Sequence, residues 1–263
     1  MKILVVNDDG ILSLGLKILV EQLKPLGEVY IFAPEKHQSG MSQALSLRKK
    51  MKVKNYGNLY GAVRAYSVKG TPADCLRLGL FFYDKIKFDL VVSGINQGAN
   101  LGSDVSRSGT IGAASEAASL GIPAIALSSP YRDFQMSERY TTALVKFLLD
   151  NNLVSSDYLL NINFPMDTFI DPKGVMFTIQ GEHKYKPAFI RKSFNKYMAI
   201  YQNMNLPEKE NSDVYCYRNG IISITPIFED RSRLEFSQKL NNDISQQLNE
   251  HLKYGKINNK GGK

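Results

Sequence analysis

Cysteine is scarce in this chain: only Cys75 and Cys216 occur, far apart in the sequence and in no Cys-x-x-Cys pair. This scarcity argues against a thiolate zinc site and against a framework of disulfides. We therefore expect free thiols and a reducing compartment. Cys75 falls inside a predicted helix, where a small core residue is a simpler interpretation than a nucleophile.

Long apolar runs are also missing. The run Ile122–Leu127 is far shorter than the roughly 20 residues that a membrane-spanning helix needs. The chain passes from its first residues directly into Ile3–Val6 and then into acidic residues, which leaves no room for the apolar segment of a signal peptide. We expect a soluble cytoplasmic protein with no membrane partner.

Acidic residues are outnumbered, because 33 Lys and Arg stand against 25 Asp and Glu, and the formal net charge is +8 at pH 7. Clustered basic residues can bind nucleic acid. Here part of the excess lies at residues 48–54 and part in the tail 253–263, patterns typical of a solvated strand edge and a frayed terminus. No RNA- or DNA-binding module is recognisable, so nucleic acid is not an expected partner.

The remaining pattern is that of an α/β protein. At 263 residues with 43% hydrophobic residues, the chain can form one large domain with an appendage. Residues 2–6 predict a buried parallel strand, residues 16–23 a helix with one apolar face, and residues 29–33 a second strand. Alternation at Leu45, Leu47 and Val53 suggests antiparallel or edge strands.

Strands and helices continue to alternate after this start. Further strands are predicted at residues 88–92, 124–127 and 159–163, and further helices from Thr71 and Pro72 onward and at residues 109–120 and 137–150. The order predicts a doubly wound, mostly parallel sheet.

The pattern changes beyond residue 165. Gly174–Ile179 and Gly220–Ile227 are β-type runs separated by polar, Tyr-rich stretches, which we interpret as a β-hairpin extension. Residues 228–254 predict an amphipathic C-terminal helix. The expected division is a core over residues 1–165, a β-hairpin extension over 166–227, and a C-terminal helix with a flexible basic tail over 228–263.

Polar residues gather where the predicted strands end. Asp8 and Asp9 follow the first strand, Ser39 lies in the loop after the second, and Asn96 and Asn100 follow the third strong strand. Because the carboxyl ends of parallel strands meet at one edge of a sheet, these oxygen donors should lie close together.

Two adjacent carboxylates at a buried strand end repel each other unless a cation lies beside them. Carboxylate, hydroxyl and amide oxygens are hard ligands, which favours Mg²⁺ or Mn²⁺ over zinc. The alternative is that Asp8 or Asp9 caps the following helix, and the spacing alone leaves both interpretations open.

Ser108-Gly109-Thr110 begins a predicted helix after a loop rich in Gly and Asn. Backbone N–H groups at such a helix start can bind phosphate, although Ser108 also fits a simple N-cap. A dinucleotide site is not indicated, because no G-x-G-x-x-G follows the first strand. His37 is the one histidine near the expected site, and a surface role and a catalytic role both stay open for it.

Several motifs together resemble the SurE survival-protein phosphatases in order and spacing over nearly the whole chain. They are Val5–Gly10, Ala33-Pro34 with Ser39-Gly40, Gly70–Cys75, Ser93–Asn100, Ser108–Thr110, Leu160–Pro165 and Ser223–Pro226.

The resemblance implies a Rossmann-like domain, a hairpin and C-terminal segment used in homodimer or homotetramer contacts, and 5′-nucleotidase activity on nucleoside monophosphates. Some activity on other phosphoesters or on short polyphosphate is also implied. It further implies one divalent ion per subunit, held by residues matching Asp8, Asp9, Ser39 and Asn96, the two aspartates also being the catalytic pair. Positions matching Asn100, Ser108, Gly109 and Thr110 line the phosphate pocket.

One departure from the family pattern is Arg107, where relatives carry an aromatic residue or His, and an arginine there could add a phosphate contact. We expect metal-assisted attack of water on phosphorus. The alternatives are a covalent aspartyl-phosphate intermediate at Asp8 or Asp9, and a nucleotide- or RNA-binding regulator without turnover.

Overall fold

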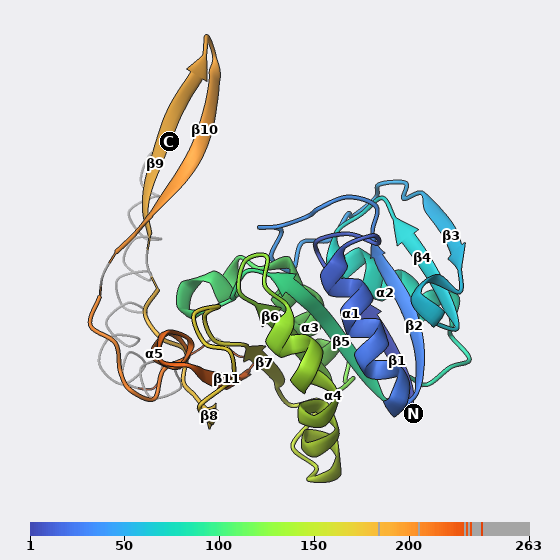
Figure 1. Ribbon diagram of the computed structural model, residues 1–263. Coiled ribbons are helices and arrows are strands. Elements are labelled where there is room, and N and C mark those ends of the chain that lie inside the picture. Colours follow the sequence, from blue (N-terminus) through green and yellow to red (C-terminus); the bar gives the residue numbers. More distant parts are fainter. Residues whose placement is uncertain (184, 205, 229, 231, 233–237, 239–263) are drawn as a thin grey trace, which may run out of the picture. The chain divides into compact units, whose positions relative to one another are not determined.

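The computed structural model describes residues 1–228 except 184 and 205, together with residues 230, 232 and 238 (Figure 1). Residues 1–229 form one compact unit, and residues 230–263 form a second. The predicted C-terminal helix and basic tail therefore lie almost wholly outside the described residues.

A nine-stranded sheet forms the centre of the first unit, in the order β3-β4-β2-β1-β5-β6-β7-β11-β8. Strands β1, β2, β4, β5, β6 and β7 are mutually parallel, β3 is antiparallel to β4, and β11 is antiparallel to β7. The bounds are β1 Lys2–Val6, β2 Glu28–Pro34, β3 Val53–Gly57, β4 Arg64–Val68, β5 Leu90–Gln97, β6 Ala124–Ser129, β7 Leu159–Asn163, β8 Gly174–Phe177 and β11 Ile221–Ile227.

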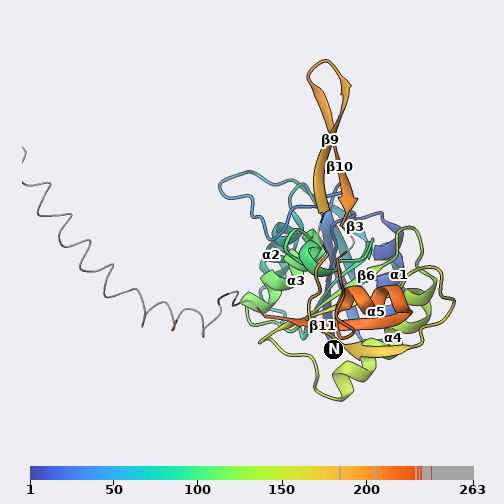
Figure 2. The same ribbon diagram turned by 90° about the vertical axis from the view of Figure 1, so that its left-hand side faces the viewer.

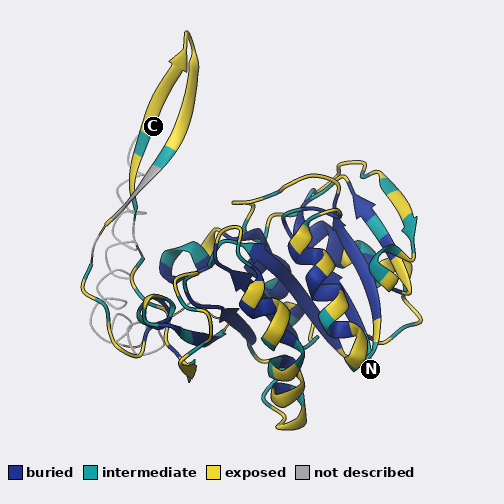
Figure 3. Ribbon diagram, viewed as in Figure 1, coloured by how far each residue is buried: buried dark blue, intermediate teal, exposed yellow. Residues whose placement is uncertain are grey.

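Helices cover both faces of this sheet. The bounds are α1 Leu14–Leu23, α2 Pro72–Phe82, α3 Gly109–Ser119, α4 Gln135–Asp150 and α5 Asp213–Asn219. Ile3 and Val5 pack in the same core cluster as residues of α1 and α4, whereas Leu4 and Val6 pack with residues of α2 and α3. Successive side chains of β1 thus enter two different cores, as expected for a strand between two helical layers. Residues 3–6 of this strand are accordingly buried (Figure 3). The prediction of a Rossmann-like, doubly wound α/β fold is confirmed.

Local sequence explains where the helices begin. Ser13 accepts a hydrogen bond from the N–H of Leu16 and caps α1. Thr71 and Asp74 form a capping box at the start of α2, where Pro72 occupies the first turn. The predicted roles of Thr71 and Pro72 are therefore confirmed, and both caps lie at the carboxyl edge of the sheet, where α1 and α2 follow β1 and β4.

The strand order places a switch point between β1 and β5. β2 and β4 lie on one side of β1, and β5, β6 and β7 lie on the other. Loops that leave the carboxyl ends of β1 and β5 therefore diverge, which leaves the space that ligands occupy in open α/β sheets.

Two strand predictions were wrong. Leu45 and Leu47 belong to no strand, and only Val53 begins one. β5 also runs on to Gln97, beyond the predicted end at residue 92, with an irregularity in its pairing to β6 between Ser93 and Asn96.

The predicted β-hairpin extension is confirmed, but the runs at 174–179 and 220–227 do not form it, because β8 and β11 are parallel neighbours in the large sheet. The hairpin lies between them in sequence. It consists of β9, Tyr185–Ser193, and β10, Lys196–Asn203, an antiparallel pair that forms a sheet of its own (Figure 2). The division of the chain at residue 165 stays a prediction.

Cys75 and Cys216 are both buried, free thiols, and Cys75 packs in the core with α2 as predicted. Within the described part of the chain, no helix has the length and apolar character needed to cross a membrane.

Candidate active site

The turn after β1 is held by Asn7. Its Nδ2 donates to the carbonyl oxygen of Gly10 at 3.0 Å and to Ser13 Oγ at 2.8 Å, and its Oδ1 accepts from the N–H of Gly10 at 3.3 Å. Gly10 has a φ of +105°, a conformation that favours glycine. Because Asn7 closes the turn and Ser13 caps α1, neither Asp8 nor Asp9 caps that helix. The capping alternative is thereby excluded.

Asp8 instead lies at the N-terminus of α3. Thr110 Oγ1 donates to Asp8 Oδ1 at 2.7 Å, and the N–H of Thr110 donates to Asp8 Oδ2 at 3.2 Å. Asp8 is only 2% exposed. Burial raises the pKa of Asp8 to about 6 and the neighbouring charge of Asp9 adds to the rise, although the Thr110 hydrogen bonds and His37 act in the opposite direction. The carboxylate is therefore only partly compensated by the protein, and a cation beside it would complete the compensation.

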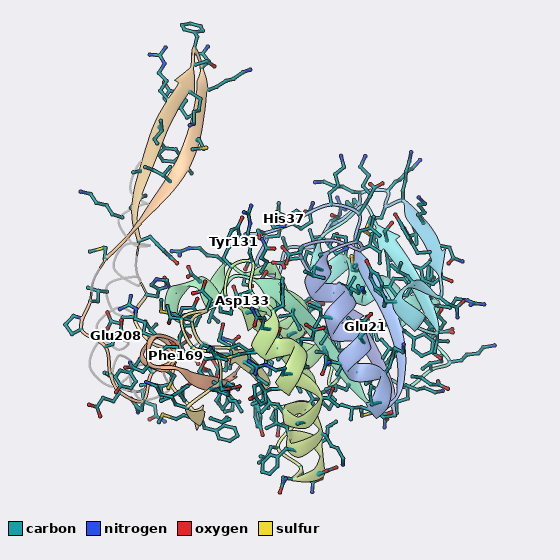
Figure 4. All side chains as sticks on the ribbon, viewed as in Figure 1. Glu21, His37, Tyr131, Asp133, Phe169 and Glu208 are labelled. Carbon is teal, nitrogen blue, oxygen red and sulfur yellow. The ribbon has the colours of Figure 1, made fainter. Side chains whose placement is uncertain are left out.

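Asp9 faces two other segments. The N–H of Gln97, at the end of β5, donates to Asp9 Oδ2 at 3.0 Å. His37 lies in the loop after β2 (Figure 4). Its Nδ1 is 3.0 Å from Asp9 Oδ1, and its side chain is 62% exposed. The adjacent aspartates thus point to different partners, one to α3 and one to β5 and His37.

Ser39 is exposed and follows Gln38, which is bound to Asp8 in the turn after β1. The N–H of Gln38 donates to the carbonyl oxygen of Asp8 at 2.7 Å. This backbone bond brings the loop after β2 to the aspartates, in agreement with the predicted meeting of the strand ends.

Asn96 and Asn100 differ in what their side chains do. Asn96 Nδ2 donates to the carbonyl oxygen of Gly98 at 2.7 Å, which leaves Asn96 Oδ1 without a hydrogen-bond partner among the described residues. Asn100 Nδ2 donates to Ser128 Oγ at 2.9 Å in a buried position. The Oδ1 atom of Asn96 is therefore available to bind a metal ion, whereas the amide nitrogen of Asn100 already donates a hydrogen bond to Ser128.

The backbone of Asn100 is equally well held. Its N–H donates to Asn163 Oδ1 at 2.7 Å, and its carbonyl oxygen accepts from Asn161 Nδ2 at 2.9 Å and from Asn163 Nδ2 at 3.2 Å. Two asparagines of β7 therefore fix the end of the Gly-rich loop. Both asparagines lie in a strand that was predicted from the sequence, but no pattern in the sequence indicated this role.

Ser108 caps α3 by accepting from the N–H of Ile111 at 3.2 Å. Because both donors of Thr110 go to Asp8, the N–H of Gly109 is the first-turn donor of α3 that has no partner within the described part of the chain. Gly109 also packs closely, since a Cβ there would lie 2.9 Å from Asp8 Cβ and 3.1 Å from the carbonyl oxygen of Gln38. The predicted helix start therefore meets both β1 and the loop after β2.

Arg107 points to its own segment. Its Nη1 lies 3.5 Å from Asp104 Oδ1 and donates to Ser103 Oγ at 3.5 Å, with most of the side chain exposed. These contacts are long, so the guanidinium is only loosely tied.

The donor set fits a hard divalent cation. No cluster of three or more His, Cys, Asp and Glu side chains suited to a metal occurs among the described residues, so a cation here needs neutral oxygens beside the two carboxylates. Ser39 and Asn96 offer such oxygens, and each is the sequence neighbour of a residue that contacts an aspartate, Gln38 at Asp8 and Gln97 at Asp9. All four groups are oxygen donors, as Mg²⁺ and Mn²⁺ prefer.

The chain resembles proteins of known family. The family model "Survival protein SurE" matches residues 3–187. The 5′-nucleotidase SurE 1 of Thermus thermophilus is 38% identical over 248 residues, which cover 91% of this chain and 96% of that protein. The 5′-nucleotidase SurE of Legionella pneumophila strain Lens is 38% identical over 254 residues, covering 94% and 98%. The crystal structure of the SurE protein from Aquifex aeolicus matches with a TM-score of 0.79 and 33% identity, over 92% of this chain and 99% of that one.

Proposed function

The chain belongs to the SurE survival-protein family, and from this premise we propose that it is a 5′-nucleotidase that hydrolyses nucleoside 5′-monophosphates to nucleoside and phosphate. The observation that carries the proposal is the meeting of three distant segments around Asp8 and Asp9. Thr110 contacts Asp8 across 102 positions of sequence, and Gln97 contacts Asp9 across 88. The site thus combines two acidic groups with a helix start that has a free N–H.

The same residues support metal dependence. Asp8, Asp9, Ser39 and Asn96 would hold one divalent ion, Mg²⁺ or Mn²⁺, in each subunit. When bound, such an ion neutralises charge on the phosphate and lowers the pKa of bound water. Thr110 holds Asp8 in position, while Gln97 and His37 orient Asp9.

Phosphate binding falls to the start of α3. The free N–H of Gly109 can donate to a phosphate oxygen, and the positive end of the helix dipole favours the negative charge that develops there. Ser108 and Thr110 act indirectly, because one caps the helix and the other binds Asp8. Asn100 would line the pocket without donating to the phosphate, because its amide nitrogen is bound to Ser128 and its amide oxygen can only accept a hydrogen bond.

Phosphate release from AMP and GMP, measured with Mn²⁺, with Mg²⁺ and after chelation, tests this function. We expect turnover that the chelator abolishes, and loss of turnover in Asp9→Asn with unchanged circular dichroism. Asp89→Asn is the matched control, because Asp89 is an exposed aspartate that accepts from the N–H of Lys2, before the start of β5. Full activity of Asp9→Asn would contradict the proposal, as would nucleotide binding without any release of phosphate.

The same assay separates the covalent alternative. A phospho-aspartate trapped by acid quench during turnover would favour an aspartyl nucleophile over attack by water. A panel of other phosphoesters and short polyphosphate then measures the breadth of substrate use.

The hairpin supports self-association into a homodimer or homotetramer. Phe189 is 70% exposed and Phe194 is 79% exposed, so the β9–β10 pair presents apolar side chains that a second copy of the chain would cover. Light scattering after gel filtration measures the mass, and a monomer at micromolar concentration would contradict this assignment. A cytoplasmic location is supported by the two free, buried thiols, and cell fractionation tests it.

A further inference from the structure

The loop that contains Ser39 packs along one face of helix α3. We define the Ser39 loop as residues 35–46. Gly109 of α3 contacts Gln38 of this loop, Gly112 contacts Ser42, and Glu116 contacts Gln43. Positions 109, 112 and 116 have the i, i+3, i+7 spacing of a single helical face. The loop therefore runs parallel to the helix for two turns.

The first two contacts are close approaches of the two backbones, and the one at Gly112 needs glycine. A Cβ at Gly112 would lie 2.0 Å from the carbonyl oxygen of Ser42, so any larger residue would force the loop away. Ser42 is also tied to the segment before α3, because its N–H donates to the carbonyl oxygen of Arg107 at 2.9 Å and its Oγ donates to that of Ser106 at 2.8 Å.

The third contact is a polar clamp on a buried carboxylate. Arg77 of α2 donates from Nε to Glu116 Oε1 at 2.5 Å, and its Nη2 also lies 2.5 Å from the same oxygen. Gln43 Nε2 donates to Glu116 Oε2 at 2.8 Å. Glu116 is only 3% exposed, so each oxygen depends on these partners in place of water. One carboxylate thereby joins α2, α3 and the Ser39 loop.

Helix α3 contacts both the proposed metal site and the Ser39 loop. The first turn of α3 fixes Asp8 through Thr110, and the third turn fixes the loop four residues after Ser39. A shift of the loop along α3 would change the position of Ser39 relative to Asp8 and would strain the hydrogen bond from the N–H of Gln38 to the carbonyl oxygen of Asp8.

We infer that the hydrogen bond between Gln43 and Glu116 positions Ser39 for the cation, so that Gln43 and Glu116 are positioning residues that set metal affinity. The inference rests on the proposed function, because it concerns the same metal site. The groups that orient metal ligands commonly change metal affinity by about 10- to 100-fold when they are removed. Gln43 acts through four residues of loop, so the lower end of that range applies.

Direct measurement of Mn²⁺ binding by calorimetry and by electron paramagnetic resonance tests this inference. We expect Gln43→Ala to weaken Mn²⁺ binding by about 10-fold. Gln43→Glu should weaken it further, because two carboxylates would then face each other. In the double variant Gln43→Glu with Glu116→Gln, residue 116 can still accept from Arg77 and can donate to residue 43, so affinity should recover.

Two further readouts separate positioning from general damage to the fold. At saturating Mn²⁺ the turnover number of Gln43→Ala should return to nearly that of the wild type, since the loop acts through metal binding. Without metal, hydrogen exchange at the backbone amide of Ser42 should be faster in Gln43→Ala than in the wild-type protein. Gln22→Ala is the matched control, because Gln22 also joins two segments through its side-chain amide, by accepting from Thr142 Oγ1 at 2.6 Å, but lies in α1.

Unchanged Mn²⁺ affinity in Gln43→Ala and Gln43→Glu would overturn the inference alone. The same holds if the double variant binds no better than Gln43→Glu, or if Gln22→Ala weakens binding equally. Absence of Mn²⁺ binding in the wild-type protein would overturn the proposed metal site together with the inference, so the two failures are distinguishable.

Discussion

Removing the hydroxyl of Thr110 should destabilise the metal-free protein. Thr110→Val keeps the shape of the side chain but deletes the donor that lies 2.7 Å from Asp8 Oδ1. Thr110 and Asp8 are both buried, so water cannot readily replace the lost hydrogen bond. Hydrogen bonds to charged groups contribute about 1.5–3 kcal/mol. Threonine and valine have similar helix propensities, so the backbone of α3 should contribute little to the difference.

Thermal and urea unfolding with excess chelator at pH 8 measure this loss. A cost of about 1.5–3 kcal/mol corresponds to a fall in Tm of about 3–12 °C for a chain of this size. Thr110→Ser retains a hydroxyl and should lose less stability than Thr110→Val. Saturating Mn²⁺ should narrow the gap between valine variant and wild type, because a cation also compensates the Asp8 carboxylate. The reasoning is refuted if the valine variant is as stable as the wild type, or if the serine variant is the less stable of the two.

Three other perturbations test separate parts of the structure. Gly109→Ala places a Cβ 2.9 Å from Asp8 Cβ, so Asp8 must shift: phosphate release should fall about 10- to 100-fold, and thermal unfolding should show a loss of about 1–3 kcal/mol. Asp74→Asn weakens the capping box and should cost about 1–3 kcal/mol at pH 7. Burial raises the pKa of Asp74, but hydrogen bonds from the backbone N–H groups of Ser46 and Thr71 outweigh burial and hold this pKa below its ordinary value of 3.8. The stabilisation by the ionised carboxylate is therefore present above pH 3.8 and is lost as pH falls through the lower folded pKa. The urea midpoints of variant and wild type should begin to approach each other below pH 3.8 and should meet below the folded pKa. Phe189→Ser on the exposed hairpin should raise the dissociation constant for self-association in sedimentation runs without lowering the monomer's activity; an unchanged constant would argue against the hairpin as the contact.

Much of the sheet could be predicted because its strands are buried on both faces. Continuous aliphatic runs identified β1, β2, β6 and β7, the spacing of apolar residues identified α1, and the cap at Thr71 with Pro72 identified α2. Leu47 misled the prediction because an alternating apolar pattern need not mean pairing: its side chain is 75% exposed in a loop. Local periodicity also found β8 and β11 as strands but could not tell which neighbours they pair with, since pairing depends on the rest of the sheet.

The sequence predicted which residues gather at the site, but it predicted their hydrogen-bond partners only in part. Parallel strand ends must meet at one edge, which explains why Asp8, Asp9 and the loop after β2 were expected together. That Thr110 would donate to Asp8, leaving Gly109 as the free donor, depends on the exact rotation of α3. The pattern of strands and loops in the sequence does not determine how α3 is rotated about its axis. The clamp at Glu116 was not anticipated either, because a lone glutamate in an Ala-rich helix gives no signal of its burial.

The Gly-rich loop before α3 has a consequence for how a nucleotide can reach the site. Segments rich in glycine and asparagine are often expected to swing open, but Asn100 is pinned at its N–H, its carbonyl and its amide nitrogen by partners on β6 and β7. The loop therefore forms a rigid wall of the site at Asn100, and any segment that opens to admit a nucleotide must lie elsewhere around the site. Slow hydrogen exchange at the Asn100 amide is the signature that such a rigid wall would leave in solution.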